Sequence, residues 1–142
     1  IIRMKLKGKK ILLVEDDSFI EDMLVRKLEL EGALCVSATN GVEGLEKLRE
    51  NSSDFDIIIT DITMPKIGGY DMAQAIKSDP DSHAIPIIVL TNRTDNIKTN
   101  AQLAALGVDA EFGKADTPLH ELVQHIVDMF EKTDDAPAET KL

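Results

Sequence analysis

Four short apolar runs in this chain each lead to a charged or hydroxyl-bearing residue. The runs cover residues 11–14, 57–60, 87–90 and, more weakly, 109–112. Continuous Ile, Val and Leu runs of this length are typical of strands buried on both faces of a parallel sheet. The polar residues that follow the runs are Glu15 and Asp16, Asp61, Thr91 and, after Gly113, Lys114. Because ligands bind where the carboxyl ends of parallel strands meet, we expect these side chains to converge in one cleft.

Stretches with helical periodicity separate the apolar runs, and residues 34–38 alternate weakly as a further strand. The predicted helices begin near Ser18, cover 41–50, run through Met72 and Ile76, end near Gly107, and cover 119–130. Ser18 and Glu21 have the spacing of a capping box, which predicts the start of the first helix. Regular alternation of strands and helices predicts an α/β fold with a parallel sheet and helices on both faces.

Length, composition and charge narrow the possible functions. The chain has 142 residues, 43% of them hydrophobic, and a net charge of −10, which predicts one globular domain that does not bind nucleic acid directly. No apolar stretch has the length of a membrane span, and no secretory signal pattern precedes the first strand. The single cysteine, Cys35, excludes an intramolecular disulfide and fits a reducing compartment, so we expect a cytoplasmic protein.

The two ends of the chain differ in composition from its centre. Residues 1–8 are basic, and we expect an N-terminal extension or a tag remnant there. Residues 9–132 contain all the predicted strands and helices. Residues 133–142 have no apolar periodicity, and we expect them to be a disordered tail.

Three acidic residues, Glu15, Asp16 and Asp17, follow the first predicted strand. Carboxylates this close together raise one another's pKa unless a cation relieves the repulsion. Mg²⁺ binds one or two carboxylates and completes its coordination with waters and phosphate oxygens. We therefore assign the metal role to Asp16, with Glu15 acting through water. Asp17 is expected to stabilise the N-terminus of the following helix through the helix dipole.

Asp61 ends the most hydrophobic of the predicted strands. A carboxylate at such a position can accept a phosphoryl group and form an acyl phosphate. Taken alone, Asp61 is equally typical of a solvated residue at a strand end. Thr91 offers a hydroxyl group and Lys114 a positive charge, and both suit a phosphoryl oxygen. The combination of these groups on four strands favours a phosphoryl-transfer site with a divalent cation.

From about Lys9 to Lys132 the chain resembles the receiver domain of response regulators in bacterial two-component signalling. Residues 10–17 resemble the first strand and acid pair of that family, and residues 61–69 follow its phosphoacceptor pattern D-x-x-M-P-x-x-x-G. Residues 86–91 and 107–114 resemble the strand with the switch hydroxyl and the segment that leads to the family's lysine. The resemblance implies a doubly wound, flavodoxin-like fold, in which a five-stranded parallel sheet of order 2-1-3-4-5 is flanked by five helices.

The resemblance also implies a chemistry and a set of partners. Asp61 takes a phosphoryl group from the phosphohistidine of a sensor histidine kinase or a histidine phosphotransfer protein. Mg²⁺, or Mn²⁺ in its place, is held by the acid pair Glu15 and Asp16, by Asp61 and by the backbone carbonyl of Thr63. The family acts as a signalling switch that catalyses its own phosphorylation and dephosphorylation, and is not otherwise an enzyme.

Within the same resemblance, Lys114 neutralises charge on the phosphoryl group and Thr91 moves towards it. This movement shifts the surface of the fourth helix, the fifth strand and the fifth helix, to which a downstream protein or output domain binds. Neither direct nucleic-acid binding nor membrane contact is expected of this domain.

Three positions depart from the family pattern. Ala115 follows Lys114 where the family has proline after a cis peptide, and a cis bond before a non-proline residue costs about 2.5–4 kcal/mol, so we expect a trans or rearranged loop. Glu111 occupies the place of the switch aromatic and is expected to stay exposed, while Phe112 faces the other side of its strand. Asn92 follows the switch hydroxyl where a small residue is usual. The departures leave the chemistry intact but alter the route from phosphate to output surface.

Other protein classes fit the sequence less well. A haloacid-dehalogenase-type phosphatase needs a second aspartate two residues after Asp61, where Thr63 stands. A flavin binder of similar topology would carry its phosphate loop where the acidic residues 15–17 lie. The alternative that stays open is a receiver-like protein-interaction module that is not regulated by phosphorylation.

Overall fold

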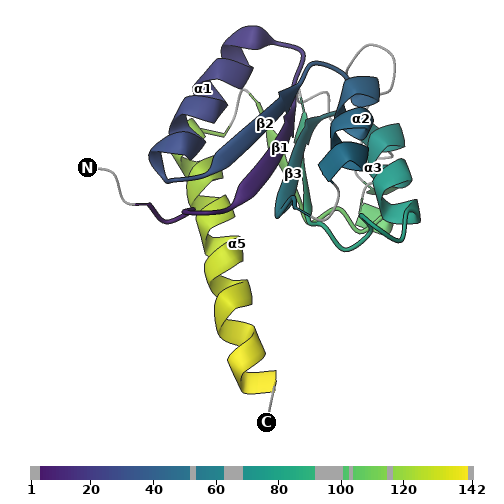
Figure 1. The fold of residues 1–142 in the computed structure, drawn as a ribbon. Helices are drawn as coiled ribbons and strands as arrows, with labels where there is room; N and C mark the ends of the chain where they lie inside the picture. Colours follow the sequence, from purple (N-terminus) through teal and green to yellow (C-terminus); the bar gives the residue numbers. More distant parts are fainter. Residues whose placement is uncertain are drawn as a thin grey trace.

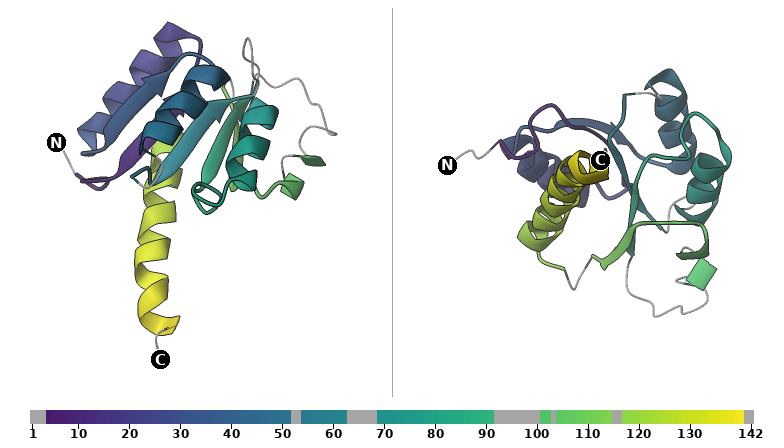
Figure 2. Two further views of the ribbon diagram at one scale, coloured as in Figure 1. Left: turned by 45° about the vertical axis from the view of Figure 1, so that its right-hand side comes forward. Right: turned by 90° about the horizontal axis from the view of Figure 1, so that it is seen from below.

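In the part of the chain that the structure describes, five parallel strands form one sheet (Figures 1 and 2). This computed structural model describes residues 4–51, 54–62, 69–91, 101–102, 104–114 and 117–140. The strands are β1 (Lys10–Val14), β2 (Leu34–Ala38), β3 (Ile57–Asp61), β4 (Ile87–Thr91) and β5 (Ala110–Gly113). Their order in the sheet is β2-β1-β3-β4-β5, so the predicted strand order is confirmed.

Helices cover both faces of this sheet. Those within the described residues are α1 (Ser18–Leu30), α2 (Gly41–Asn51), α3 (Gly69–Ser78) and α5 (Leu119–Thr140). Helices α1 and α5 lie on one face, and α2 and α3 lie on the other (Figure 1). The doubly wound, flavodoxin-like architecture is therefore confirmed, with four helices described where five were predicted. The helix predicted to end near Gly107 falls largely on residues 92–100 and 103, outside the described residues.

The apolar runs are buried on both faces, as predicted. In β1, Ile11 and Leu13 pack in the layer with α1 and α5, whereas Leu12 and Val14 pack in the layer with α2 and α3. This alternation follows from the two-residue period of a strand. All five residues of β3 are buried. The sheet is thus the shared wall of two apolar layers, and its central strands have no solvated face.

The register of the strands aligns their carboxyl ends. Val14 at the end of β1 pairs with Ala38 of β2 and with Thr60 of β3. Thr91 at the end of β4 pairs with Gly113 at the end of β5. Because these parallel strands end level with one another, the residues that follow them come together at one edge of the sheet.

The start of α1 differs from the predicted capping box. Its N-cap is Asp17, whose Oδ1 accepts hydrogen bonds from the backbone N–H of Phe19 at 2.9 Å and of Ile20 at 3.3 Å. Ser18 is already the first helical residue, and the Glu21 side chain accepts a bond from Ser37 Oγ at 3.1 Å instead of reaching back to the cap. The capping-box prediction is therefore wrong by one residue, whereas the supporting role predicted for Asp17 is confirmed.

Near both ends of the chain, described residues take part in the fold or continue a helix. In the segment expected to be an extension, Leu6 is fully buried, and its N–H donates to the Glu31 carbonyl at 2.7 Å. Helix α5 continues to Thr140, although residues 133–142 were expected to be disordered. The division of the chain at residues 8 and 132 stays a prediction.

Among the described helices, none combines the length and apolar character that a membrane crossing requires.

Candidate functional site

The predicted acidic residues converge at the carboxyl edge of the sheet. Glu15 directly follows β1, and Asp61 is the last residue of the neighbouring strand β3. Glu15, Asp16 and Asp61 each offer a carboxylate oxygen, and these oxygens lie within 4.8 Å of one another. Glu15 and Asp61 are buried, with exposed fractions of 1% and 2%, whereas Asp16 is exposed. The site is therefore a buried carboxylate pair with a third carboxylate open to solvent.

Lys114 joins the two buried carboxylates. Its Nζ donates to Asp61 Oδ2 at 2.8 Å and to Glu15 Oε2 at 3.0 Å. When the side chains alone are considered, the exposed fractions are 10% for Lys114, 0% for Glu15 and 3% for Asp61, so all three are nearly inaccessible. Burying a carboxylate without a compensating partner is costly, so the shared ammonium group stabilises this arrangement. A single ammonium group therefore donates to two buried carboxyl groups.

The position of Lys114 is set by the backbone of β4 and β5. The N–H of Lys114 donates to the Thr91 carbonyl at 2.7 Å, which extends the pairing of Thr91 with Gly113 by one further bond. Burial alone would lower the pKa of Lys114, but the hydrogen bonds to Asp61 and Glu15 outweigh this effect and raise the pKa above its ordinary value. Lys114 therefore keeps its positive charge at neutral pH.

Glu15 has a more unusual environment than the other acids. Burial raises its pKa from 4.5 to about 7, opposed by the backbone N–H of Asp17 and by Lys114, and assisted by the negative charge of Asp61. The Asp17 N–H donates to Glu15 Oε2 at 3.0 Å, the same oxygen that Lys114 contacts. The other oxygen, Oε1, is buried and has no hydrogen-bond partner among the described residues. Such a buried acceptor calls for a further ligand.

A divalent cation fits these residues. Mg²⁺ and Mn²⁺ prefer carboxylate oxygens, and the site offers three of them close together. A cation would also lower the pKa of Glu15. It would in addition give the buried Oε1 of Glu15 an electrostatic partner. The backbone carbonyl of Thr63, the fourth predicted ligand, lies outside the described residues.

Thr91 lies where the prediction placed it along the sheet. It ends β4, one strand away from Asp61, and its side chain is half-buried. Asn92 and Ala115, two of the positions that depart from the family pattern, lie outside the described residues.

The structure separates Glu111 and Phe112, as the period of a strand predicts. Phe112 faces the layer of α1 and α5, where its ring meets the ring of His125 edge-on with centroids 4.9 Å apart. Glu111 pairs with Val89 of β4 and is half-buried rather than exposed. The prediction that Glu111 is exposed is therefore wrong, because the residue lies within a strand that pairs with β4. Phe112 does not occupy the position of the missing aromatic.

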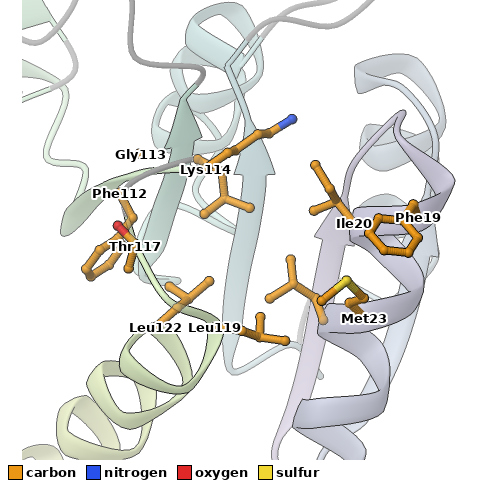
Figure 3. A pocket seen from close by; sticks show the side chains of 11 residues that line it. Phe19, Ile20, Met23, Phe112, Gly113, Lys114, Thr117, Leu119 and Leu122 are labelled. Atoms are coloured by element: carbon orange, nitrogen blue, oxygen red, sulfur yellow. The ribbon is translucent and has the colours of Figure 1, made fainter.

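An apolar groove adjoins the charged site between α1 and α5 (Figure 3). Its volume is about 270 Å³, and Lys114 forms part of its rim. Phe19 and Met23 of α1 lie on one side, with Phe112 and Leu119 opposite them. Phe19 and Met23 are large apolar residues with exposed fractions of 71% and 40%.

Sequence reasoning missed this groove. The helical spacing of Ile20, Met23 and Leu24 predicts that all three share the inward apolar face of α1, yet Met23 is 40% exposed. The available signal was Phe19, an aromatic residue that lies beside that apolar face rather than on it, two residues after Asp17. Sequence reasoning also missed the contact between the backbone N–H of Asp17 and Glu15. Every residue except proline has a backbone N–H, so residue type does not indicate which of them donates to a side chain.

Comparisons with known proteins agree with this geometry. The family model of the response regulator receiver domain matches residues 11–126. The probable transcriptional regulator ycf27 of Guillardia theta is 37% identical over 83 residues, which cover 58% of this chain and 31% of that protein. The chain thus spans about a third of the length of this curated relative.

Solved structures show the same fold. The response regulator receiver domain protein from Clostridium thermocellum matches with a TM-score of 0.77 at 30% identity, covering 89% of this chain and 97% of that one. The phosphorylated cyanobacterial phytochrome response regulator RcpA matches with a TM-score of 0.71 at 30% identity, covering 88% and 92% of the two chains. By sequence, by fold and by the acidic cluster with its lysine, the chain belongs to the response regulator receiver domain family of two-component systems.

Proposed function

We propose that this chain accepts a phosphoryl group on Asp61 and acts as a phosphorylation switch. The donor is the phosphohistidine of a sensor histidine kinase or of a histidine phosphotransfer protein. The observation that carries the proposal is the contact of Lys114 Nζ with Asp61 Oδ2 at 2.8 Å, inside a cluster that also contains Glu15 and Asp16. RcpA, a neighbour at 30% identity, is a phosphorylated response regulator, which supports the same chemistry here.

The reaction exchanges a phosphorus–nitrogen bond for a phosphorus–oxygen bond. A carboxylate oxygen of Asp61 attacks the phosphorus, and the bond to the imidazole nitrogen breaks. The imidazole keeps the electron pair and takes up a proton, while Asp61 becomes an acyl phosphate. The ammonium group of Lys114, which lies 2.8 Å from the attacking carboxylate, stabilises negative charge on the phosphoryl oxygens. Later hydrolysis of the acyl phosphate restores Asp61 and resets the switch.

Glu15, Asp16 and Asp61 would hold Mg²⁺ or Mn²⁺, together with the backbone carbonyl of Thr63. The bound cation neutralises phosphoryl oxygens and orients them for transfer. Asp16, the exposed member of the cluster, would hold the cation on the side that is open to solvent and to the incoming phosphoryl group. Glu15 is buried and held by two donors, which fix the position of its carboxyl group in the cluster.

The switch transmits its state through Thr91 and the Lys114 backbone to the surface of the fourth predicted helix, β5 and α5. A downstream protein or an output domain binds there. With Glu111 at the position of the aromatic switch, this surface responds through the Thr91 to Lys114 contact rather than through a moving ring. We place the protein in the cytoplasm, where its kinase partner would present the phosphohistidine.

The donor protein has to cover the cleft, because its histidine must reach Asp61. Phe19 and Met23 are exposed large apolar residues beside that cleft, and exposed apolar surface of this kind is typical of a protein interface. We therefore propose that the apolar groove between α1 and α5 receives an apolar helix face of the donor. The variant Phe19→Ala should slow phosphorylation by a protein donor and leave phosphorylation by acetyl phosphate unchanged. Equal rates for both donors in this variant would remove the groove from the interface.

Intact mass spectrometry tests the proposed function directly. In the presence of Mg²⁺ and acetyl phosphate, the parent protein should gain the mass of one phosphoryl group, and Asp61→Asn should gain none. Asp54→Asn is the matched control, since Asp54 is an exposed aspartate outside the cluster. The alternative, an interaction module without phosphorylation, is favoured by the departure at Glu111. It predicts no mass gain in the parent, and equal phosphorylation of the parent and Asp61→Asn would assign the nucleophile elsewhere.

A further inference from the structure

The loop between β1 and α1 is fixed by hydrogen bonds that converge on Asp17. Its side-chain oxygen accepts from the N–H of Phe19 and of Ile20, at 2.9 and 3.3 Å. Its carbonyl accepts from the N–H of Glu21 at 3.0 Å. Asp17 thus joins an extended backbone, with φ −85° and ψ 110°, to the first turn of α1. Two of these bonds hold the Asp17 side chain and one holds its carbonyl, so together they fix the backbone at Cα17, from which the N–H of Asp17 also extends.

The N–H of this fixed residue points into the charged site. It donates to Glu15 Oε2 at 3.0 Å, and Lys114 Nζ donates to the same oxygen at 3.0 Å. Two donors on one oxygen define the orientation of the Glu15 carboxylate. They also leave Oε1 buried without a partner among the described residues. Glu15, Asp16 and Asp61 form the cluster that offers carboxylate oxygens within 4.8 Å of one another.

We propose that Asp17 is a positioning residue for this cluster: by capping α1 it holds the backbone N–H that orients Glu15 towards a bound cation. The inference rests on the proposed function, because it assumes that the cluster holds a divalent metal. Asp17 itself is no ligand in this account. Its side chain faces the first turn of the helix, and its effect on the metal passes through Glu15.

The side chain of Asp17 matters because it locks the backbone that follows β1. Alanine at this position removes both side-chain acceptor bonds at the start of α1 and leaves only the carbonyl bond to Glu21, so the backbone that carries the N–H is held less firmly. Lys114 then remains the one described donor to Glu15 Oε2. Asparagine keeps a side-chain oxygen at the cap and removes the charge, and it is as good an N-cap residue as aspartate. The two substitutions therefore separate positioning from charge.

The chain offers a matched control at the start of α2. Asn40 Oδ1 accepts from the N–H of Glu43 at 2.9 Å, and its carbonyl accepts from the N–H of Gly44 at 2.9 Å. The variant Asn40→Ala thus removes a comparable helix cap. None of the described hydrogen bonds of Asn40 reaches Glu15, Asp61 or Lys114.

Binding of Mn²⁺, followed by electron paramagnetic resonance of the free ion, tests the proposal in the full chain. Removal of groups that orient a metal ligand weakens metal affinity by about 10–100-fold, and we expect a loss near the lower end for Asp17→Ala. Asp17→Asn should restore most of the affinity, and Asn40→Ala should bind as the parent does. Thermal unfolding of each variant verifies that the losses are not caused by unfolding. If Asp17→Ala does not fold, Asp17→Gly removes the same acceptor and frees the same backbone, with the same expected loss.

Two results would overturn the proposal. Equal affinities of Asp17→Ala and Asn40→Ala would reduce Asp17 to an ordinary helix cap. An affinity of Asp17→Asn as low as that of Asp17→Ala would show that the charge of Asp17 acts on the metal, rather than its cap.

A metal-free measurement keeps the inference separate from the proposed function. The residue-17 amide should exchange faster with solvent in Glu15→Ala and in Asp17→Ala than in the parent, while Asn40→Ala leaves it protected. Unchanged protection in Glu15→Ala would contradict the positioning contact, whatever the metal does. Failure of the parent to bind Mn²⁺ or to be phosphorylated would instead contradict the proposed function.

Discussion

The strands that carry the reactive carboxylates are buried more deeply than the strand that leads to Lys114. Every residue of β3 and four of the five residues of β1 are buried, whereas all four residues of β5 are half-buried. Close-packed interiors resist deformation, and elements with fewer buried contacts open at lower free energy. The carboxylates thus lie at the ends of rigid central strands. Lys114 follows the edge strand β5, beside the surface that we propose to respond to phosphorylation.

This difference suits a switch. The distance between Glu15 and Asp61 must stay constant for a metal to bind; Glu15 follows β1 and Asp61 ends β3, and these two central strands pair with each other. In the proposed switch the response has to reach the surface, and Lys114 meets the Thr91 carbonyl on the outer pair of strands, next to that surface. The site thus has a rigid half, with the carboxylates on β1 and β3, and an outer half, with Thr91 and Lys114 on β4 and β5. The following substitutions test whether these two halves differ in rigidity.

The first test compares a core side chain of β3 with an aromatic side chain of β5. Ile59 is fully buried, and Ile59→Ala should lower the free energy of unfolding by about 4 kcal/mol. Phe112 is the larger residue but is half-buried, so Phe112→Ala should cost about 2 kcal/mol. Denaturant unfolding measures both values. A larger loss for Phe112→Ala would show that β5 belongs to the rigid half.

The second test removes the charge that joins the two halves. Lys114→Met leaves two buried carboxylates without their shared partner, and breaking such a pair costs about 3 kcal/mol. Arg26→Met is the control, because Arg26 and Asp22 form an exposed helix pair with side chains 78% and 59% exposed, and such a pair contributes about 0.5 kcal/mol. Chemical denaturation at pH 7 without metal gives both values. Equal losses would mean that Lys114 is no more than a surface charge.

The third test uses the raised pKa of Glu15. Its folded-state pKa of about 7 lies above its ordinary value of 4.5, chiefly through burial, so between these values the folded protein holds a proton that the unfolded chain has released. The free energy of unfolding should therefore fall as pH rises from about 4.5 to about 7 in metal-free protein. Glu15→Gln should lack this component, and saturating Mg²⁺ should reduce it in the parent. Parallel pH profiles for the parent and Glu15→Gln would contradict the raised pKa.

The comparison also explains how far the sequence alone could lead. Runs such as 11–14 and 57–60 are local signals, and parallel strands end at a common edge, so the convergence of Asp16, Asp61 and Lys114 could be predicted. The family resemblance added the order of the strands. These features depend on residue type and spacing, both of which are visible in the sequence.

Other features depend on contacts that residue type does not determine. Asp17 and Ser18 are both good helix caps, and only the backbone geometry assigns the cap to Asp17. The exposure of Met23 follows from the groove between α1 and α5, which Met23 lines. The partial burial of Glu111 follows from its place in a strand that pairs with β4. The continuation of α5 to Thr140 has no apolar pattern that would predict it.

The smallest expected effect concerns the outer half of the site in its response to phosphorylation. In receivers with an aromatic switch, the ring fills the space that the hydroxyl leaves as it moves to the phosphate. Glu111 occupies that position here, and moving a charged carboxylate deeper into the protein costs desolvation free energy. A beryllofluoride phosphate mimic should therefore change amide exchange in β5 and the start of α5 only slightly in the parent, and more in Glu111→Tyr. The matched comparison is β3, whose exchange should stay unchanged in both proteins because its residues are buried on both faces. If the parent shows the larger response and Glu111→Tyr adds nothing, the edge strand transmits the signal without an aromatic ring, and the weakened switch is refuted.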